Sequence, residues 1–212
     1  MLLNADDSQL VLVDYQTGLM PVIFENDRVV ANAVRLARMA RLFGVPVWGS
    51  AQNPEKLGQN MPEVQAAIDS AGGRTLAKMH FSAAADGLGD WLRPPVRKPT
   101  SGGNARSFPK HLQKPAAQAV QEEGREGRSM VVMAGCEAHV CLLQTALDFL
   151  EEEFDVWVVT DACSSRLERD RDAAFDRLAG NGAELVTTEM VAFEWARSCE
   201  HPAFRDLLAL VK

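Results

Sequence analysis

Cysteine and positive charge are both scarce in this chain. Four cysteines among 212 residues are too few for a disulfide scaffold, and no two of them form the C-x-x-C pair of zinc ribbons and thioredoxin-type motifs. The formal net charge of −7 argues against nucleic acid as a partner, because phosphate binding needs a basic face. A reducing, cytoplasmic location is therefore the default expectation.

Long hydrophobic runs are missing as well. No apolar stretch approaches the ~20 residues that a membrane span needs, so no membrane partner is expected. The opening residues, MLLNADDSQLVLVD, lack the basic region of a signal peptide and meet acidic residues at Asp6 and Asp7. With 47% hydrophobic and 24% charged residues, the composition is ordinary for a soluble globular protein.

Short apolar segments alternate with helix-like segments along the chain. The predicted strands are residues 9–13, 46–50, 74–81, 129–135, 154–162 and 183–188. The predicted helices are residues 26–44, 61–73, 139–153, 168–182, 189–199 and 202–212. Continuously apolar strands between helices are typical of a parallel sheet covered on both faces. We therefore predict a single α/β domain over residues 1–212, a Rossmann-like three-layer α/β/α fold with a doubly wound, mainly parallel sheet of six strands.

The alternation is interrupted by a Pro/Gly-rich insertion at about residues 85–112, followed by a predicted helix near 113–122. A crossover between parallel strands needs only about a dozen residues, and this connection is far longer. Long loops are usually functional or disordered. We expect the insertion to cover a site or to form an oligomer contact, with simple decoration as the alternative.

Residues able to do chemistry stand where three predicted strands end. Ligands of open α/β sheets collect at the carboxyl ends of the strands, and here these ends carry Asp14, Lys78 and the loop that leads to Cys141. A cysteine attacks as the thiolate, whose pKa falls near cations and helix N-termini. We expect Lys78 to supply the cation and Asp14 to accept the thiol proton and return it to a leaving group. Free N–H groups of residues 136–141 would bind an oxyanion, which suits acyl transfer on an amide through a thioester.

Five motifs resemble the isochorismatase-like cysteine hydrolase family, and specifically its branch of isochorismatase-domain-containing proteins. They are VLVDYQTGLM (11–20), AKMHFSA (77–83), GCEAHVCLLQTALDFL (135–150), TDACSSR (160–166) and DRDAAFDRLAGNGAELVTTE (170–189). The resemblance implies a catalytic triad of Asp14, Lys78 and Cys141. It also implies a cis peptide bond between Cys136 and Glu137, with an oxyanion hole from the backbone N–H groups of Glu137 and Cys141. Homodimers or homotetramers are implied as well.

The resemblance extends to residues around the cluster. Gln16 matches the family's D-x-Q and is expected to support the site, Phe81 to line an apolar substrate pocket, and His139 to neighbour the nucleophile; all three are candidate substrate-binding residues. Ala138 departs from the family, which often has threonine there to hold the loop. The nicotinamidases carry metal-binding histidines after the second strand, whereas residues 50–58 here read SAQNPEKLG, so neither a metal nor a nicotinamide substrate is expected.

No cofactor is expected either, because the first strand is followed by DYQTGLM rather than by a glycine-rich phosphate fingerprint. The resulting prediction is a cysteine hydrolase, of amidase type, that cleaves an amide, ureide or carbamoyl C–N bond of a small molecule. Three alternatives stay open: hydrolysis of an ester or vinyl ether, a non-catalytic binding or scaffold protein that retains the fold, and a redox sensor using Cys136 and Cys141.

Overall fold

The computed structural model describes residues 1–94 and 127–211. Its centre is a sheet of six strands in the order β3-β2-β1-β4-β5-β6, and every pair of neighbours is parallel. The strands are β1 (Ser8–Val13), β2 (Val47–Gln52), β3 (Arg74–Lys78), β4 (Met130–Gly135), β5 (Asp155–Val159) and β6 (Glu184–Val186). Each residue of β1 and β4 is buried, as expected of central strands covered on both faces.

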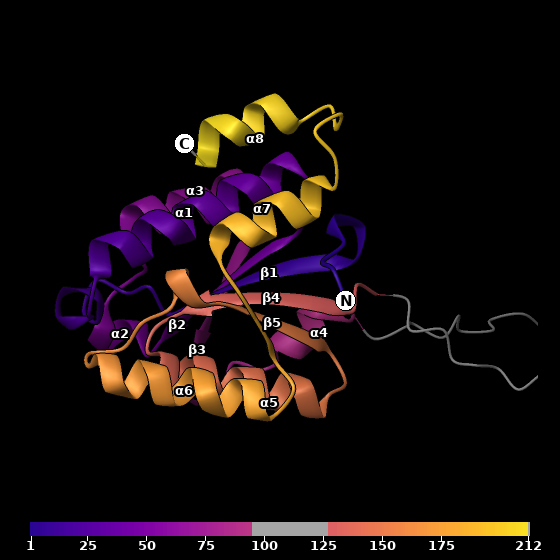
Figure 1. The fold of residues 1–212 in the computed structure, drawn as a ribbon. Coiled ribbons are helices and arrows are strands. Elements are labelled where there is room, and N and C mark those ends of the chain that lie inside the picture. Colours follow the sequence, from indigo (N-terminus) through magenta and orange to yellow (C-terminus); the bar gives the residue numbers. More distant parts are fainter. Residues whose placement is uncertain (95–126, 212) are drawn as a thin grey trace, which may run out of the picture.

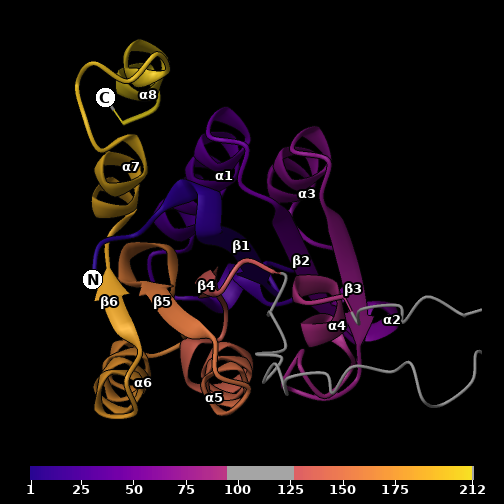
Figure 2. The ribbon, with the colours of Figure 1, turned by 90° about the vertical axis from the view of Figure 1, so that its right-hand side faces the viewer.

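Helices cover both faces of the sheet (Figures 1 and 2). One face carries α1 (Asn26–Leu42), α3 (Pro62–Ser70) and α7 (Thr188–Ala196), with α8 (Phe204–Val211) lying outside α7. The other face carries α4 (Leu88–Leu92), α5 (Leu143–Glu151) and α6 (Glu168–Gly180). The short α2 (Pro54–Leu57) follows β2. The three-layer, doubly wound fold is therefore confirmed, with a sheet that is parallel throughout the described residues.

Several elements differ from the predictions; the strand predicted over 154–162, for example, ends at Val159 and is followed by a 3-10 turn, Thr160–Ala162. The strand predicted over 74–81 ends at Lys78, because the N–H groups of Met79 and His80 turn to the carboxylate of Asp86 at 2.8 and 2.9 Å. The helix predicted over 139–153 starts with a π-helical turn, Ala138–Leu142, before α5. Helix α4 lies inside the predicted insertion and was not expected. The remainder of the insertion and the helix near 113–122 lie outside the described residues.

One side chain joins the two described segments that flank residues 95–126. Gln9, near the start of β1, donates from Nε2 to the carbonyl oxygens of Leu92 and Arg128 at 3.0 and 3.2 Å. Because Gln9 lies at the amino end of its strand, Leu92 and Arg128 lie at the amino-terminal edge of the sheet. No helix among the described residues has the length and apolar character needed to cross a membrane.

Candidate active site

The order of the strands creates a switch point at β1, from which the chain winds towards β2 on one side and towards β4 on the other. Val13 is paired with Gly135, so the residues that follow, Asp14 and Cys136, leave the sheet side by side. Asp14 has a positive φ of 53°, which turns the chain sharply at the strand end. This edge is where ligands of such sheets bind, and it is where the predicted residues meet.

Asp14 and Lys78 form a buried ion pair across this edge. The ammonium Nζ lies 2.8 Å from Asp14 Oδ2, and both side chains are fully buried. Lys78 comes from β3, two strands away from β1, so its long side chain reaches past the end of β2. A charge pair this deeply buried is stable only when further hydrogen bonds satisfy both partners, and the neighbouring residues supply them.

Three acceptors surround the Lys78 ammonium in addition to Asp14. They are Gln52 Oε1 at 2.7 Å and the carbonyl oxygens of His80 and Phe81 at 3.2 and 2.9 Å. An ammonium has three N–H donors, and these three oxygens take all of them. The contact with Asp14 is therefore one of opposite charges rather than a fourth hydrogen bond.

The Asp14 carboxylate has one occupied and one open oxygen. Oδ1 accepts a hydrogen bond from Ser50 Oγ at 2.7 Å, whereas the buried Oδ2 has no hydrogen-bond donor among the described residues. Oδ2 is thus a charged oxygen with unused acceptor capacity, which is what a proton acceptor requires.

Cys141 lies in the π-helical turn after β4, and only 5% of its surface is exposed. Burial raises the pKa of its thiol to about 12, the charge and hydrogen bonding of Asp14 act in the same direction, and Lys78 only partly offsets them. The expectation of a lowered pKa is therefore wrong, because burial and Asp14 outweigh the cation. At rest Cys141 is a neutral thiol close to Asp14 and Lys78.

The loop ahead of Cys141 is held by its backbone. The Cys136–Glu137 peptide bond is cis, as the resemblance implied. The N–H of Ala138 donates to Ser164 O at 2.7 Å, which anchors the loop where the family often has threonine. The N–H of Glu137 has no acceptor within the described parts of the chain, so it is free to bind an oxyanion. The Glu137 carboxylate accepts from Arg166 Nε at 2.8 Å.

The three residues proposed to contact substrate are placed differently from one another. Gln16 is fully buried. Its Nε2 donates to Gln52 O and its Oε1 accepts from the Gln52 N–H, so Gln16 positions the residue that holds Lys78. Phe81 is 53% exposed and contributes its carbonyl oxygen, while its ring lies at the surface. His139 Nδ1 lies 2.9 Å from Ser165 Oγ. Substrate contacts by these residues remain predictions.

Sequence reasoning missed Ser50 and Gln52. They lie two residues apart on β2, so both point to one face of the sheet, towards Asp14 and Lys78. Their spacing of two at the end of a buried strand was the sequence signal that could have predicted a polar contribution to the site. Thr145 was missed as well: its hydroxyl donates to Cys141 O at 2.7 Å and accepts from the N–H of Ala83 at 3.0 Å, which ties the cysteine to the segment after Lys78.

Buried acids around the cluster predict a loss of stability in alkali. Burial raises the pKa of Cys136 and of Cys141 to about 12, and raises the pKa values of Cys163 and Tyr15 well above their ordinary values. The unfolded chain loses these protons from about pH 9, whereas the folded chain keeps them. The stabilisation is complete below pH 9 and is lost as pH rises towards 12. Urea unfolding should show a fall of about 1.4 kcal/mol per thiol and pH unit above 9.

The control for this titration is Cys136→Ala, which removes one of the thiols. Its free energy of unfolding should fall less steeply between pH 9 and 10.5 than that of the unsubstituted protein. Equal slopes, or a stability that does not change over this range, would contradict the assignment.

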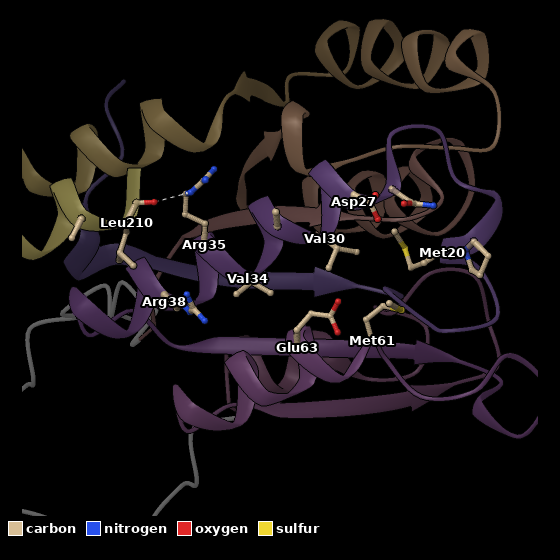
Figure 3. Close-up of a pocket in the computed structure, with 13 residues that line it drawn as sticks. Met20, Asp27, Val30, Val34, Arg35, Arg38, Met61, Glu63 and Leu210 are labelled. Atoms are coloured by element: carbon tan, nitrogen blue, oxygen red, sulfur yellow. Dashed lines mark hydrogen bonds between the residues drawn. The ribbon is translucent and has the colours of Figure 1, made fainter. Parts of the chain in front are cut away.

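A separate pocket of about 590 Å³ lies among α1, α3 and α8 and contains none of Asp14, Lys78 and Cys141 (Figure 3). In residues 1–94 and 127–211, no group of three or more histidine, cysteine, aspartate or glutamate side chains is arranged to hold a metal ion. The candidate site consists of the Asp14–Lys78 ion pair, the Cys141 thiol and the backbone loop ahead of it.

A doubly wound parallel sheet with such a cluster at its switch point places the chain among α/β enzymes that carry their site at the carboxyl edge. The Isochorismatase domain model matches residues 8–190, and the chain belongs to this family. The family resemblance is thus confirmed, and membership supports a hydrolase in general terms. Isochorismatase domain-containing protein 2A of Mus musculus is 32% identical over 207 residues, covering 98% of this chain and 84% of that protein.

Solved structures agree with this assignment. The MAR1 ribonuclease from Caenorhabditis elegans has a TM-score of 0.80 at 26% identity and covers 100% of this chain and 92% of its own. The YcaC gene product from Escherichia coli, described as an octameric hydrolase of unknown specificity, has a TM-score of 0.72 at 26% identity, with 99% and 95% covered.

Proposed function

We propose that this chain is a cysteine hydrolase that cleaves the C–N bond of a small amide, ureide or carbamoyl compound through a thioester on Cys141. The observation that carries the proposal is the buried Asp14 carboxylate, whose open Oδ2 lies beside the Lys78 ammonium and close to the Cys141 thiol. A proton acceptor, a cation and a nucleophile within one buried cluster are the parts that such a reaction needs.

The first half-reaction transfers the acyl group to sulfur. Asp14 Oδ2 takes the thiol proton as Cys141 Sγ forms a bond to the substrate carbonyl carbon, and the carbonyl π electrons move to its oxygen. The free N–H of Glu137 and the N–H of Cys141 stabilise this oxyanion. When the carbonyl re-forms, the C–N bond breaks, and protonated Asp14 gives its proton to the departing nitrogen.

The second half-reaction releases the acid. Asp14, again ionised, accepts a proton from water as the water oxygen attacks the thioester carbon. The C–S bond then breaks, the sulfur recovers the proton from Asp14, and the carboxylic acid leaves. Lys78 stabilises the carboxylate when it is charged and the sulfur when it is a thiolate, so it acts through its charge in both halves.

A thiol with a raised pKa fits this scheme, because Asp14 removes the proton only as the bond to substrate forms. We favour a small molecule over RNA despite the ribonuclease name of one structural neighbour, since the formal net charge of −7 is unfavourable for phosphate binding. We also propose a cytoplasmic homo-oligomer; the octameric state of the YcaC product supports the oligomer.

The test is a screen for ammonia release from small amides, ureides and carbamoyl compounds, with Cys141→Ala as the matched control. We expect at least one compound to be turned over by the unsubstituted protein and not by the variant, because the alanine side chain has no nucleophile. Mass spectrometry of the acid-quenched reaction should show the acyl group on the peptide that contains Cys141.

Circular dichroism must show that the Cys141→Ala protein is folded. Equal turnover by the two proteins would contradict the nucleophile assignment. If the product is an alcohol or a carbonyl compound rather than an amine, the bond is an ester or vinyl ether. Absence of turnover across the panel, together with tight binding of a compound, would support the non-catalytic alternative.

A further inference from the structure

Helix α1 carries a stripe of mixed apolar and charged residues on its accessible side. Its inner face packs into the core with Val29, Ala33, Leu36, Ala37 and Ala40. The opposite, solvent-facing side of such a helix is normally polar along its whole length. One stripe along the accessible side of α1 places exposed Ala31 and half-buried Val34 between Asp27 and Arg38, while Arg28 and Arg35 lie beside this stripe. We call the four residues of the stripe the α1 seam.

The α1 seam lies along a groove. The 590 Å³ pocket is bordered by the start of α3, with Met61 and Glu63, and by the end of α8, with Ala209 and Leu210. Figure 3 shows the labelled side chains of α1 in a row between these two borders. The Arg35 side chain strengthens the α8 border, because its Nε donates to Leu210 O at 2.8 Å. The groove is therefore lined by apolar residues of α1, Val30, Ala31 and Val34, together with charged residues of α1 and α3.

We propose that the α1 seam binds the α1 seam of a second copy of this chain, with the two helices antiparallel across a two-fold axis. A two-fold interface requires a patch that is complementary to itself. The seam meets this requirement, because its residues are spaced by four, three and four, as in a coiled-coil stripe. An axis midway between Ala31 and Val34 brings Ala31 of each copy onto Val34 of the other.

The same axis brings opposite charges together at both ends. Asp27 of each copy then faces Arg38 of the other, at positions that are eleven residues, or about 16 Å, apart on one helix. Neither side chain has an ion-pair partner among the described residues, so both are available to a neighbour. The α1 seam has opposite charges at its two ends and apolar residues between them. It is therefore complementary to an identical seam that runs antiparallel to it.

The experiment exchanges the charges of Asp27 and Arg38 and measures association from the molecular mass in solution. Arg38→Glu should weaken association, because each end of the interface then places two carboxylates together, and Asp27→Arg should do the same with two guanidiniums. We expect at least a tenfold higher dissociation constant for each variant by sedimentation. The double variant Asp27→Arg/Arg38→Glu restores opposite charges and should recover most of the affinity.

Arg28→Glu is the matched control, because Arg28 is an exposed arginine of the same helix outside the seam. It should leave the mass distribution unchanged. Circular dichroism checks that every variant is folded. A monomeric unsubstituted protein at micromolar concentration, single variants that associate normally, or a double variant that stays dissociated would each overturn the proposal. These outcomes do not depend on any enzymatic activity.

Discussion

Replacing Asp14 by asparagine is expected to make Cys141 more reactive towards iodoacetamide while it stops turnover. The carboxylate is one of the causes that raise the pKa of the Cys141 thiol to about 12, and Lys78 acts in the opposite direction. Removing the carboxylate leaves the cation, so the pKa of Cys141 should fall. The thiolate fraction at pH 7 should then rise about tenfold for each unit by which this pKa falls. Turnover should nevertheless fall by about 10²–10⁴-fold, because no base remains to accept and return the proton.

The measurement is the rate of alkylation of the Cys141 peptide from pH 6 to pH 10. It is best made in a Cys199→Ser background, because Cys199 is the exposed cysteine. Lys78→Met is the paired variant: it removes the influence that lowers the pKa, so alkylation should become slower than in the Asp14-containing parent. Slower labelling of Asp14→Asn, or a parent whose labelling levels off below pH 9, would show that the thiol is not held in its neutral form by Asp14.

Lys78→Met alone is expected to destabilise the fold by about 3–5 kcal/mol, because it leaves the Asp14 carboxylate buried without its partner. Removing both charges, in Asp14→Asn/Lys78→Met, should recover much of this loss. Replacing both partners of a buried ion pair lowers the free energy of unfolding far less than removing one partner and leaving the other charge buried. The free energy of unfolding in urea at neutral pH measures each term of this double-mutant cycle.

Lys56→Met is the control for the loss of a lysine, because Lys56 is exposed on α2. Its effect should stay within about 0.5 kcal/mol. If Lys78→Met costs no more than this control, or if the double variant is as unstable as the sum of the single variants, the two charges do not depend on one another as their 2.8 Å separation implies.

The sheet and its cluster could be anticipated for a simple geometric reason. Parallel strands buried on both faces are continuously apolar, and their carboxyl ends share one edge. Asp14, Lys78 and the loop that leads to Cys141 could therefore be expected at one edge, whereas the choice of Cys141 over Cys136 rested on the predicted helix start and the family motif. The strand ends could not give the ionisation state of Cys141, because its pKa depends on burial and on the side to which Asp14 turns. These are properties of the packed site rather than of the local sequence.

Longer-range features were out of reach for related reasons. Gln52 reaches Lys78 only because β2 lies between β1 and β3, and the order of strands is not written in any one segment. Asp86 ends β3 early by accepting the N–H groups that a longer strand would have paired. The groove along α1 exists because α3 and α8, distant in the sequence, border the same helix.

The two hydrogen bonds donated by Gln9 affect how well this chain tolerates changes in its length. Leu92 and Arg128, which flank residues 95–126 in the sequence, are held to one amide at the edge of the sheet opposite to the reacting groups. The entropy of closing a loop grows only with the logarithm of its length. Insertions or deletions between Leu92 and Arg128, including a fused reporter domain, should therefore leave the arrangement of Asp14, Lys78 and Cys141 unchanged. This connection is thus a suitable place to change the length of the chain.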